Sequence, residues 1–211
     1  MTTQKKIVYC SGPLFSPEEI GGMTAIAEAL EAAGYETFLP HRDGIEAYVM
    51  RFASSALGSR LVPTRPLVDR AIFALDVFQI AERADCLVFN VNGRVPDEGG
   101  VAETAIAYAI GTPVVLYKND ARAPFGGGDN AMLLGLTSER VVAKVPAIPG
   151  AVERAVRDAA RRPSAWSPGL TSTVALGRKI WSVLEPANRR RGHKEPSDVV
   201  ARIVEICAAE V

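Results

Sequence analysis

The sequence predicts an α/β fold, a doubly wound, five-stranded parallel sheet of the flavodoxin or Rossmann-like type with helices on both faces and a helical C-terminal extension. Short apolar runs alternate with helical patterns between residues 7 and 145, as in consecutive βαβ units. Polar residues cluster where several predicted strands end, which is where open α/β sheets bind ligands. We therefore expect an α/β domain over 1–147 and a helical extension over 148–211 that packs on the same domain.

The first βα unit is marked at both ends of its helix. The β-rich run at 7–10 is closed by a Ser-Gly-Pro turn, which predicts a short strand. Ser16 then provides an N-cap, Pro17 suits the first helical position, and Glu19 completes a capping box. Apolar residues recur at helical spacing up to Gly34, a favourable residue just after a helix.

The second strand is predicted at 35–40 and is followed by a polar cluster at 41–44. Residues 45–66 fit no neighbouring unit and indicate an insertion or lid, with helical potential in its first half. An amphipathic helix is predicted over 67–84, where Asp76 lies beside the apolar stripe.

The apolar run at 86–91 predicts a buried strand, and the stretch after it carries two acids, Asp97 and Glu103. An alanine-rich helix begins there and ends near Gly111. Glycines at 99 and 100 allow a tight turn and a close approach to a ligand. The simpler interpretation is that Asp97 caps this helix and Glu103 only complements its dipole.

The remainder of the chain predicts two more strands and several helices. The strands are expected at 113–117 and 141–145, with a polar loop at 120–130 and a short helical turn at 131–135 between them; helices are expected at 151–161, 171–186 and 196–209. The basic run at 188–194 is more simply a solvated loop than a nucleic-acid site, because no aromatic residues interleave it.

The composition favours small-molecule chemistry inside a reducing compartment. Hydrophobic residues make up 48% of the 211-residue chain, and 24 basic residues balance 24 acidic ones, so no overall charge favours nucleic acid or an anionic membrane. Cys10, Cys86 and Cys207 are odd in number and are expected to be free thiols. Neither a signal-peptide pattern nor a spanning apolar run is seen, so we expect a cytoplasmic protein.

Several classes of site lack their sequence patterns. The early glycines do not form a dinucleotide fingerprint, and no P-loop pattern is present. The chain has two histidines and no zinc-type Cys/His spacing. We therefore expect no metal and no redox cofactor.

Taken in order, five segments resemble the nucleoside 2-deoxyribosyltransferase family over roughly residues 7 to 135. The segments are Ile7-Val8-Tyr9-Cys10-Ser11-Gly12-Pro13-Leu14-Phe15-Ser16, Leu39-Pro40-His41-Arg42-Asp43-Gly44, Asp76 ahead of Ala84-Asp85, Asp97-Glu98-Gly99-Gly100-Val101-Ala102-Glu103, and Asp129-Asn130-Ala131-Met132. The chain departs from the family's pattern at two points. Gly100 replaces a threonine or similar residue, and the interval from Asp76 to Asp85 is one residue longer.

The resemblance implies a doubly wound sheet, with residues 1–147 as the catalytic domain, and exchange of the base of a 2′-deoxynucleoside with retention of configuration. It places the nucleophile on Glu103 and the phenol that orients it on Tyr9. It implies that Asp76 and Asp97 are acids that face the base, and that Asn130 contacts the sugar. The cleavage of an N-glycosidic bond agrees with this assignment, since it needs a carboxylate at the anomeric carbon and a proton donor at the base.

The resemblance also implies further contacts to a nucleoside or nucleotide substrate and a free nucleobase, with no nucleic acid or membrane partner. These substrate-binding candidates are Ser11, Gly12, Pro13, Phe15, His41, Arg42, Asp43, Asn92, Gly99, Gly100, Asn130 and Met132. In the family, the asparagine that matches Asn130 reaches the neighbouring subunit's site. A homo-oligomer, at least a dimer, is therefore expected.

Two other functions remain open. A nucleoside 5′-monophosphate N-glycosidase would use the same carboxylate and pass the sugar to water. It would bind phosphate in part through Ser11, Gly12, Ser16 and Arg42. A non-catalytic nucleotide-binding or sensing module would keep only the fold.

Single residues also have simpler interpretations. Tyr9 would be a core tyrosine, Asp76 a solvated helix residue, Asn130 a turn residue, and 41–43 a polar turn.

Overall fold

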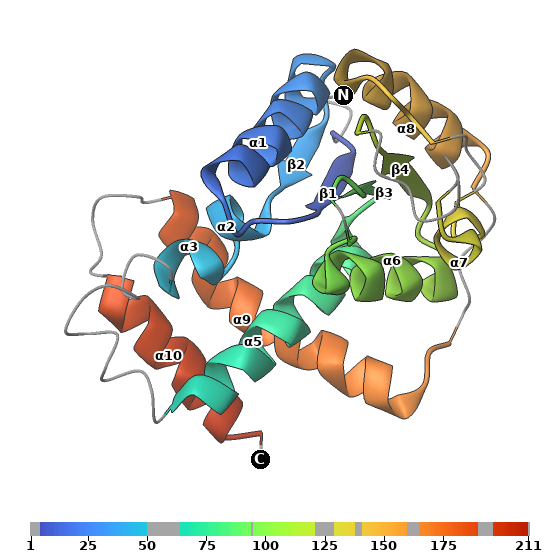
Figure 1. Cartoon of the computed structure of the whole chain (residues 1–211). Helices are drawn as coiled ribbons and strands as arrows, with labels where there is room; N and C mark the ends of the chain where they lie inside the picture. The colour runs from blue at the N-terminus through green and yellow to red at the C-terminus, as the bar shows by residue number, and fades with distance from the viewer. Residues whose placement is uncertain are drawn as a thin grey trace. The chain divides into compact units, whose positions relative to one another are not determined.

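The computed structural model describes residues 5–49, 64–93, 95–120, 129–137, 141–159, 165–189 and 196–210. The chain divides into two compact units, one formed by Met1–Leu39 with Arg83–Ala165 and the other by Pro40–Glu82 with Trp166–Val211 (Figure 1). The helix α8 (Ile148–Arg157) belongs by its contacts to the first unit. The division expected after residue 147 stays a prediction.

The first unit contains a parallel sheet, as the sequence predicts. Its strands are β1 (Ile7–Ser11), β2 (Glu36–Phe38), β3 (Cys86–Asn90) and β4 (Val114–Tyr117), in the order β2-β1-β3-β4. All three pairings are parallel, and Tyr9 in β1 lies opposite Phe38 in β2 and Leu87 in β3. The α/β class with a parallel sheet is therefore confirmed.

The fifth strand predicted at 141–145 is wrong, because the described part of the sheet has four strands. Val142 makes an isolated bridge to Tyr117, with hydrogen bonds from Val142 N to Leu116 O (2.8 Å) and from Lys118 N to Val142 O (2.9 Å). Val145–Ala147 then forms a 3₁₀ turn. Its proline cannot donate to a strand ladder, so the β-branched pattern ends after one bridge.

One face of the sheet carries the core of the first unit. The helix α1 (Pro17–Ala32) starts at the N-cap Ser16, whose hydroxyl accepts a hydrogen bond from Glu19 N at 3.2 Å, as predicted. Alternate strand residues pack with residues of α1 and α8 on this face. The buried side chains there include Val8, Cys10, Val88 and Val115 from the strands, Met23, Ile26 and Leu30 from α1, and Ile148, Ala151 and Val152 from α8.

The other face carries α6 (Glu98–Ile110), the helix predicted from its alanine-rich sequence. Tyr9, Ser11 and Phe89 point to this face, because each alternates with a residue of the opposite core. The buried positions of α6 are mainly small: Gly100, Thr104, Ala107 and Ile110. Its C-terminus is closed by Gly111, whose φ of +79° requires the freedom of glycine.

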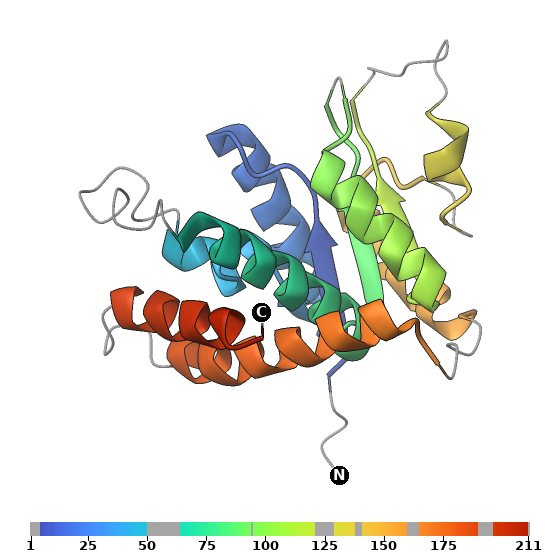
Figure 2. The same ribbon diagram turned by 90° about the horizontal axis from the view of Figure 1, so that it is seen from below.

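The second unit is helical. It comprises α2 (Pro40–Asp43), α3 (Glu46–Val49), α5 (Arg65–Phe78), α9 (Pro168–Arg189) and α10 (Pro196–Ala208). Figure 2 shows α10 lying along α9, and α5 packs against both. A Cβ at Gly177 of α9 would lie 2.0 Å from the carbonyl oxygen of Ala74, so glycine is needed where α9 crosses α5. The helices predicted at 67–84, 171–186 and 196–209 are confirmed.

Two predictions about this unit have different outcomes. The polar turn considered as the simpler interpretation of 41–43 is the short helix α2, closed by a hydrogen bond from Gly44 N to Pro40 O at 2.8 Å. Most of the insertion predicted at 45–66 lies outside the described residues, since the structure describes only 45–49 and 64–66 of it. Across the described ranges, none of the helices combines the length and apolar character that crossing a membrane requires.

Candidate active site

The carboxylate of Glu103 is held by two hydroxyl groups from β1. The Tyr9 hydroxyl donates a hydrogen bond to Oε1 at 2.8 Å, and the Ser11 hydroxyl donates one to Oε2 at 2.6 Å. Residues two apart on a strand share a face, so both hydroxyls lie on the side of the sheet that α6 covers. Each carboxylate oxygen therefore has its own donor near the carboxyl end of the central strand.

The tyrosine of this group is fixed by the sheet itself. Its side chain is fully buried, and its ring stacks on Phe38 from the adjacent strand with centroids 5.5 Å apart and planes at 20°. Tyr9 is thus a core residue, as the simpler interpretation held, and its hydroxyl also binds Glu103. A phenol packed in this way has little rotational freedom, so it fixes the direction of the carboxylate.

The place of α6 over the sheet depends on Gly100. A Cβ at this position would lie 2.3 Å from the Phe89 ring of β3, which is fully buried. Gly100 thus gives Phe89 its space, and this explains why the chain lacks the larger residue of the family pattern here. Three residues later on the same helix, Glu103 reaches Tyr9 and Ser11.

Asp97 is the N-cap of α6. Its Oδ2 accepts a hydrogen bond from Gly100 N at 2.7 Å, and the acid and the first helical turn are thereby tied together. This is the simpler role considered for Asp97. A second role as an acid that faces the base stays a prediction.

A polar network links the ends of β3 and β4. Asn92 donates a side-chain hydrogen bond to Asn119 at 2.7 Å, and its own oxygen accepts one from Asn119 N at 2.9 Å. Asp120 accepts from Gly93 N at 2.8 Å. The buried Asn90, at the end of β3, accepts from Asn92 N at 3.1 Å. Asn92, which is expected to bind substrate, therefore also has a structural role, because it joins the loops that follow β3 and β4.

Lys118 is the charged centre of this region, and it was missed in the sequence. Its side chain is only 8% exposed, and its ammonium pairs with Asp129 and lies 4.0 Å from Asp120. Asp129 directly precedes Asn130, so the ion pair ties the segment that carries Asn130 to the end of β4. The signal in the sequence was a lysine and an asparagine directly after a predicted strand, beside an acid.

Asn130 and Met132 lie at a mostly apolar hollow of about 530 Å³. Its lining residues are Gly93, Val95, Pro96, Glu98, Val101, Lys118, Asp129, Asn130, Met132 and Leu133. The Asn130 side chain caps the short helix α7 (Ala131–Leu134) by accepting from Met132 N at 2.9 Å. Met132 is 78% exposed.

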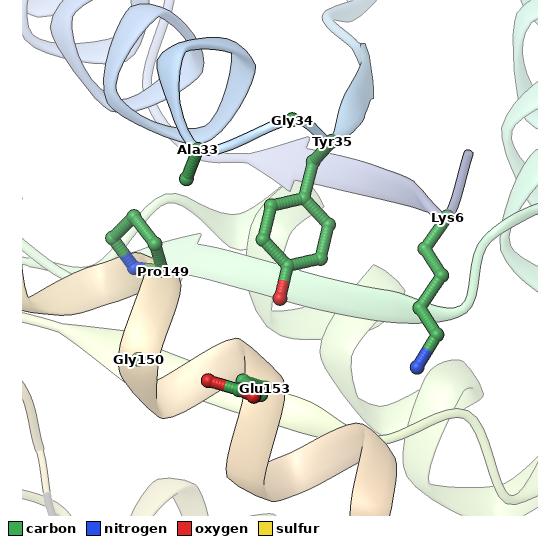
Figure 3. Close-up of a pocket in the computed structure, with 7 residues that line it drawn as sticks. All are labelled: Lys6, Ala33, Gly34, Tyr35, Pro149, Gly150 and Glu153. Atoms are coloured by element: carbon green, nitrogen blue, oxygen red, sulfur yellow. The ribbon is translucent and has the colours of Figure 1, made fainter.

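A second hollow, of about 440 Å³, lies where the strands begin (Figure 3). Lys6 directly precedes β1 and Tyr35 directly precedes β2, while Glu153 belongs to α8. Burial and the nearby Glu153 raise the pKa of the Tyr35 phenol. None of the residues predicted for the site lines this hollow.

The loop after β1 holds three further candidates. Gly12 has a φ of +152°, and a Cβ there would lie 2.7 Å from Met23 Sδ, so this position suits glycine. Pro13 is buried, whereas Phe15 is 87% exposed. Phe15 N donates to Glu19 at 2.8 Å, which fixes the loop to the start of α1.

Four of the candidates belong to the second unit. Arg42 pairs with its neighbour Asp43 at 2.8 Å, so each partly neutralises the other. Burial and the Arg42 charge lower the pKa of His41. Asp76 is 8% exposed, so its interpretation as a solvated helix residue is wrong. The roles expected for these four residues stay predictions.

The extra residue between Asp76 and Asp85 has a structural counterpart. After α5 the chain forms a π-helix over Gln79–Arg83, before Asp85 accepts a hydrogen bond from Ile7 N at 2.8 Å. A π turn takes one residue more than an α turn, and this absorbs a single-residue insertion without ending the helix. Such turns are frequent at functional sites.

The described residues contain no group of three or more acids, histidines or cysteines arranged to hold a metal ion. The three cysteines are free, as the sequence predicts, and the structure shows that all three are buried. The group that this region does bring together is a carboxylate held by two hydroxyl groups, near the N-terminus of a helix.

The chain is similar to solved structures at low identity and to one protein family over much of its length. A solved structure of a conserved protein from Enterococcus faecalis V583 is 18% identical, with a TM-score of 0.47, over 72% of this chain and 99% of that chain. The 2-deoxyribosyltransferase from Bacillus psychrosaccharolyticus is 19% identical, with a TM-score of 0.48, over 68% of this chain and 90% of that chain. No curated protein matches the chain significantly. The nucleoside 2-deoxyribosyltransferase family matches residues 8–135, more than half of the sequence, and the chain therefore belongs to this family.

Proposed function

We propose that the protein moves 2-deoxyribose between nucleobases through a covalent intermediate on Glu103. The observation that supports this most directly is the Glu103 carboxylate with a hydroxyl donor on each oxygen, in a chain of the nucleoside 2-deoxyribosyltransferase family. A side chain held in one orientation loses little entropy when it attacks, which is what a nucleophile requires.

The reaction divides into two displacements at the anomeric carbon. In the first, an oxygen of Glu103 bonds to C1′ while the C1′–N bond breaks, and the electron pair leaves with the base, which takes a proton. In the second, a nitrogen of the incoming base attacks C1′, releases Glu103 and loses its proton. Two inversions restore the original configuration. Asp76 and Asp97 remain the candidates for the proton transfers.

The tyrosine contributes by fixing and tuning the carboxylate. Its hydrogen bond to Oε1 stabilises the ionised form before attack. The same bond stabilises the glutamate when it leaves in the second displacement. Because Phe38 packs on the ring, the phenol cannot follow the carboxylate into another orientation.

A homo-oligomer is part of the proposal. Met132 is 78% exposed and Val95 is 74% exposed, and both line the hollow that holds Asn130. Apolar side chains grouped in this way favour coverage by a second copy. Asn130 would then contact the sugar bound to the neighbouring subunit. Subunits carrying Glu103→Ala, mixed with subunits carrying Asn130→Ala, should regain part of the activity once exchange has been shown.

Incubation of a 2′-deoxynucleoside with a different free base tests the main proposal. A new nucleoside is expected, and intact-protein mass spectrometry without acceptor should show a deoxyribosyl adduct that Glu103→Ala lacks. Release of free sugar alone would favour the N-glycosidase instead. Binding without any base release, across nucleosides and their monophosphates, would favour a sensing module.

A further inference from the structure

The hydroxyl of Ser11 donates a hydrogen bond to the second carboxylate oxygen of Glu103, the proposed nucleophile. Ser11 is the last residue of β1 and is 1% exposed, and its bond to Glu103 Oε2 is 2.6 Å long. Tyr9 already orients the carboxylate through Oε1. One donor is sufficient to set a direction, so the second donor calls for its own chemical reason.

That reason lies in the substrate. When a carboxylate attacks an anomeric carbon, one oxygen forms the new bond and the other remains an acceptor. In glycosides that carry a 2-hydroxyl, hydrogen bonds to this hydroxyl strengthen in the transition state. A 2′-deoxyriboside has no such hydroxyl to offer to the nucleophile. A partly buried acceptor oxygen that is left without a donor is costly, so the protein has to supply one.

We propose that Ser11 supplies this donor in place of a 2′-hydroxyl and thereby selects 2′-deoxyribosides over ribosides. The inference rests on the proposed function, because it takes Glu103 as the nucleophile. A ribose hydroxyl would meet an oxygen that already accepts a bond from Ser11, so a riboside gains little from its extra group. It also brings an oxygen atom into the space beside the Ser11 side chain.

The end of β1 holds this hydroxyl in place. Ser11 pairs in register with Phe89 of β3. At the next residue, Gly12, a Cβ would lie 2.7 Å from Met23 Sδ and 2.9 Å from Asn90 Cβ. The backbone of Gly12 therefore packs closely against these two side chains. The strand end therefore has little room to withdraw when a 2′-hydroxyl approaches. A donor in a fixed position discriminates between the two sugars, whereas a mobile donor would move aside for the 2′-hydroxyl.

The test compares wild type, Ser11→Ala and Ser11→Thr on a 2′-deoxynucleoside and the ribonucleoside with the same base. Values of kcat/KM for base release are measured for both substrates across pH, with circular dichroism and melting temperature as controls of folding. Ser11→Ala should lose about tenfold on the deoxynucleoside and raise the ribo-to-deoxy ratio of kcat/KM at least tenfold, because a 2′-hydroxyl then becomes the donor. The acid limb of its profile should move to higher pH, since the ionised carboxylate has lost a donor.

Ser11→Thr keeps the hydroxyl and should keep the wild-type ratio. An unchanged ratio in a folded Ser11→Ala protein, beside a wild type that exchanges bases, would overturn the role of Ser11 alone. The same holds if Ser11→Thr shifts the ratio as far as Ser11→Ala does. A wild type that releases no base from either substrate would overturn the proposed function, and this inference with it.

Discussion

The two ends of the sheet carry the same three kinds of side chain in different surroundings. The carboxyl end has Glu103, Tyr9 and Lys118, and the amino end has Glu153, Tyr35 and Lys6 (Figure 3). At the carboxyl end, Tyr9 is fully buried and bonded to Glu103, and Lys118 is paired with Asp129. At the amino end, glutamate and lysine are exposed to solvent.

Size does not separate the two hollows, which measure about 530 Å³ beside Asn130 and about 440 Å³ beside Tyr35, and neither Glu103 nor Tyr9 lines either of them. What differs is how far each group is withdrawn from water and held by neighbours. A carboxylate in water is well solvated and free to turn, whereas Glu103 is fixed between two donors. The comparison teaches that residue type alone does not identify a site, and it supplies a matched control for each substitution below.

The largest difference in rate is expected between variants of the two glutamates, Glu103 and Glu153. Glu103→Ala should lower base exchange by on the order of 10⁴-fold, because the covalent route loses its nucleophile. Glu153→Ala should leave the rate within error, since this carboxylate lies in the hollow at the amino end. Steady-state rates of base exchange check both. Similar losses in the two variants would show that the difference between the ends carries no functional meaning.

The two lysines should differ in stability. Lys118→Met removes the ammonium that pairs with Asp129 and lies near Asp120, and the free energy of unfolding should fall by about 3 kcal/mol. Lys6→Met should change it by less than about 0.5 kcal/mol, as is usual for an exposed residue. Urea unfolding measures both. If the charge is the cause, Lys118→Met combined with Asp129→Asn should be less destabilised than Lys118→Met alone.

Much of the fold of the first unit, and the acids of the candidate site, can be predicted from the sequence, because short local patterns determine them. The strand and helix pattern of the first unit, the caps at Ser16 and Gly111, and the acids after β3 all follow from short segments. Glu103 and Tyr9 are 94 positions apart, and it was the family resemblance that paired them.

The features that were missed depend on contacts between distant segments. Val142 has a strand-like sequence, yet one bridge is all it forms before the proline turn. The sequence explains Gly100 by a tight turn and a close approach to a ligand, whereas the structure places the Phe89 ring beside it. Lys118 resembles a surface lysine in the sequence, and only the fold brings Asp129 to it. Ser11 was expected near the substrate, whereas its direct bond to the nucleophile required coordinates.

The smallest effect is expected for the two tyrosines, and it isolates the value of one hydroxyl group. Tyr9→Phe keeps the ring that stacks on Phe38 and removes only the donor to Glu103 Oε1, so the fold should persist. A hydrogen bond to a charged group contributes about 1.5–3 kcal/mol, so kcat/KM should fall by roughly 10- to 100-fold. The acid limb of the pH profile should move to higher pH, because the ionised carboxylate has lost a donor.

Tyr35→Phe removes a phenol whose pKa is raised by burial and by Glu153, and which is therefore neutral at physiological pH. Its rate and pH profile should match those of the wild type, and equal losses in the two variants would mean that the hydroxyl of Tyr9 acts through general packing and not through Glu103.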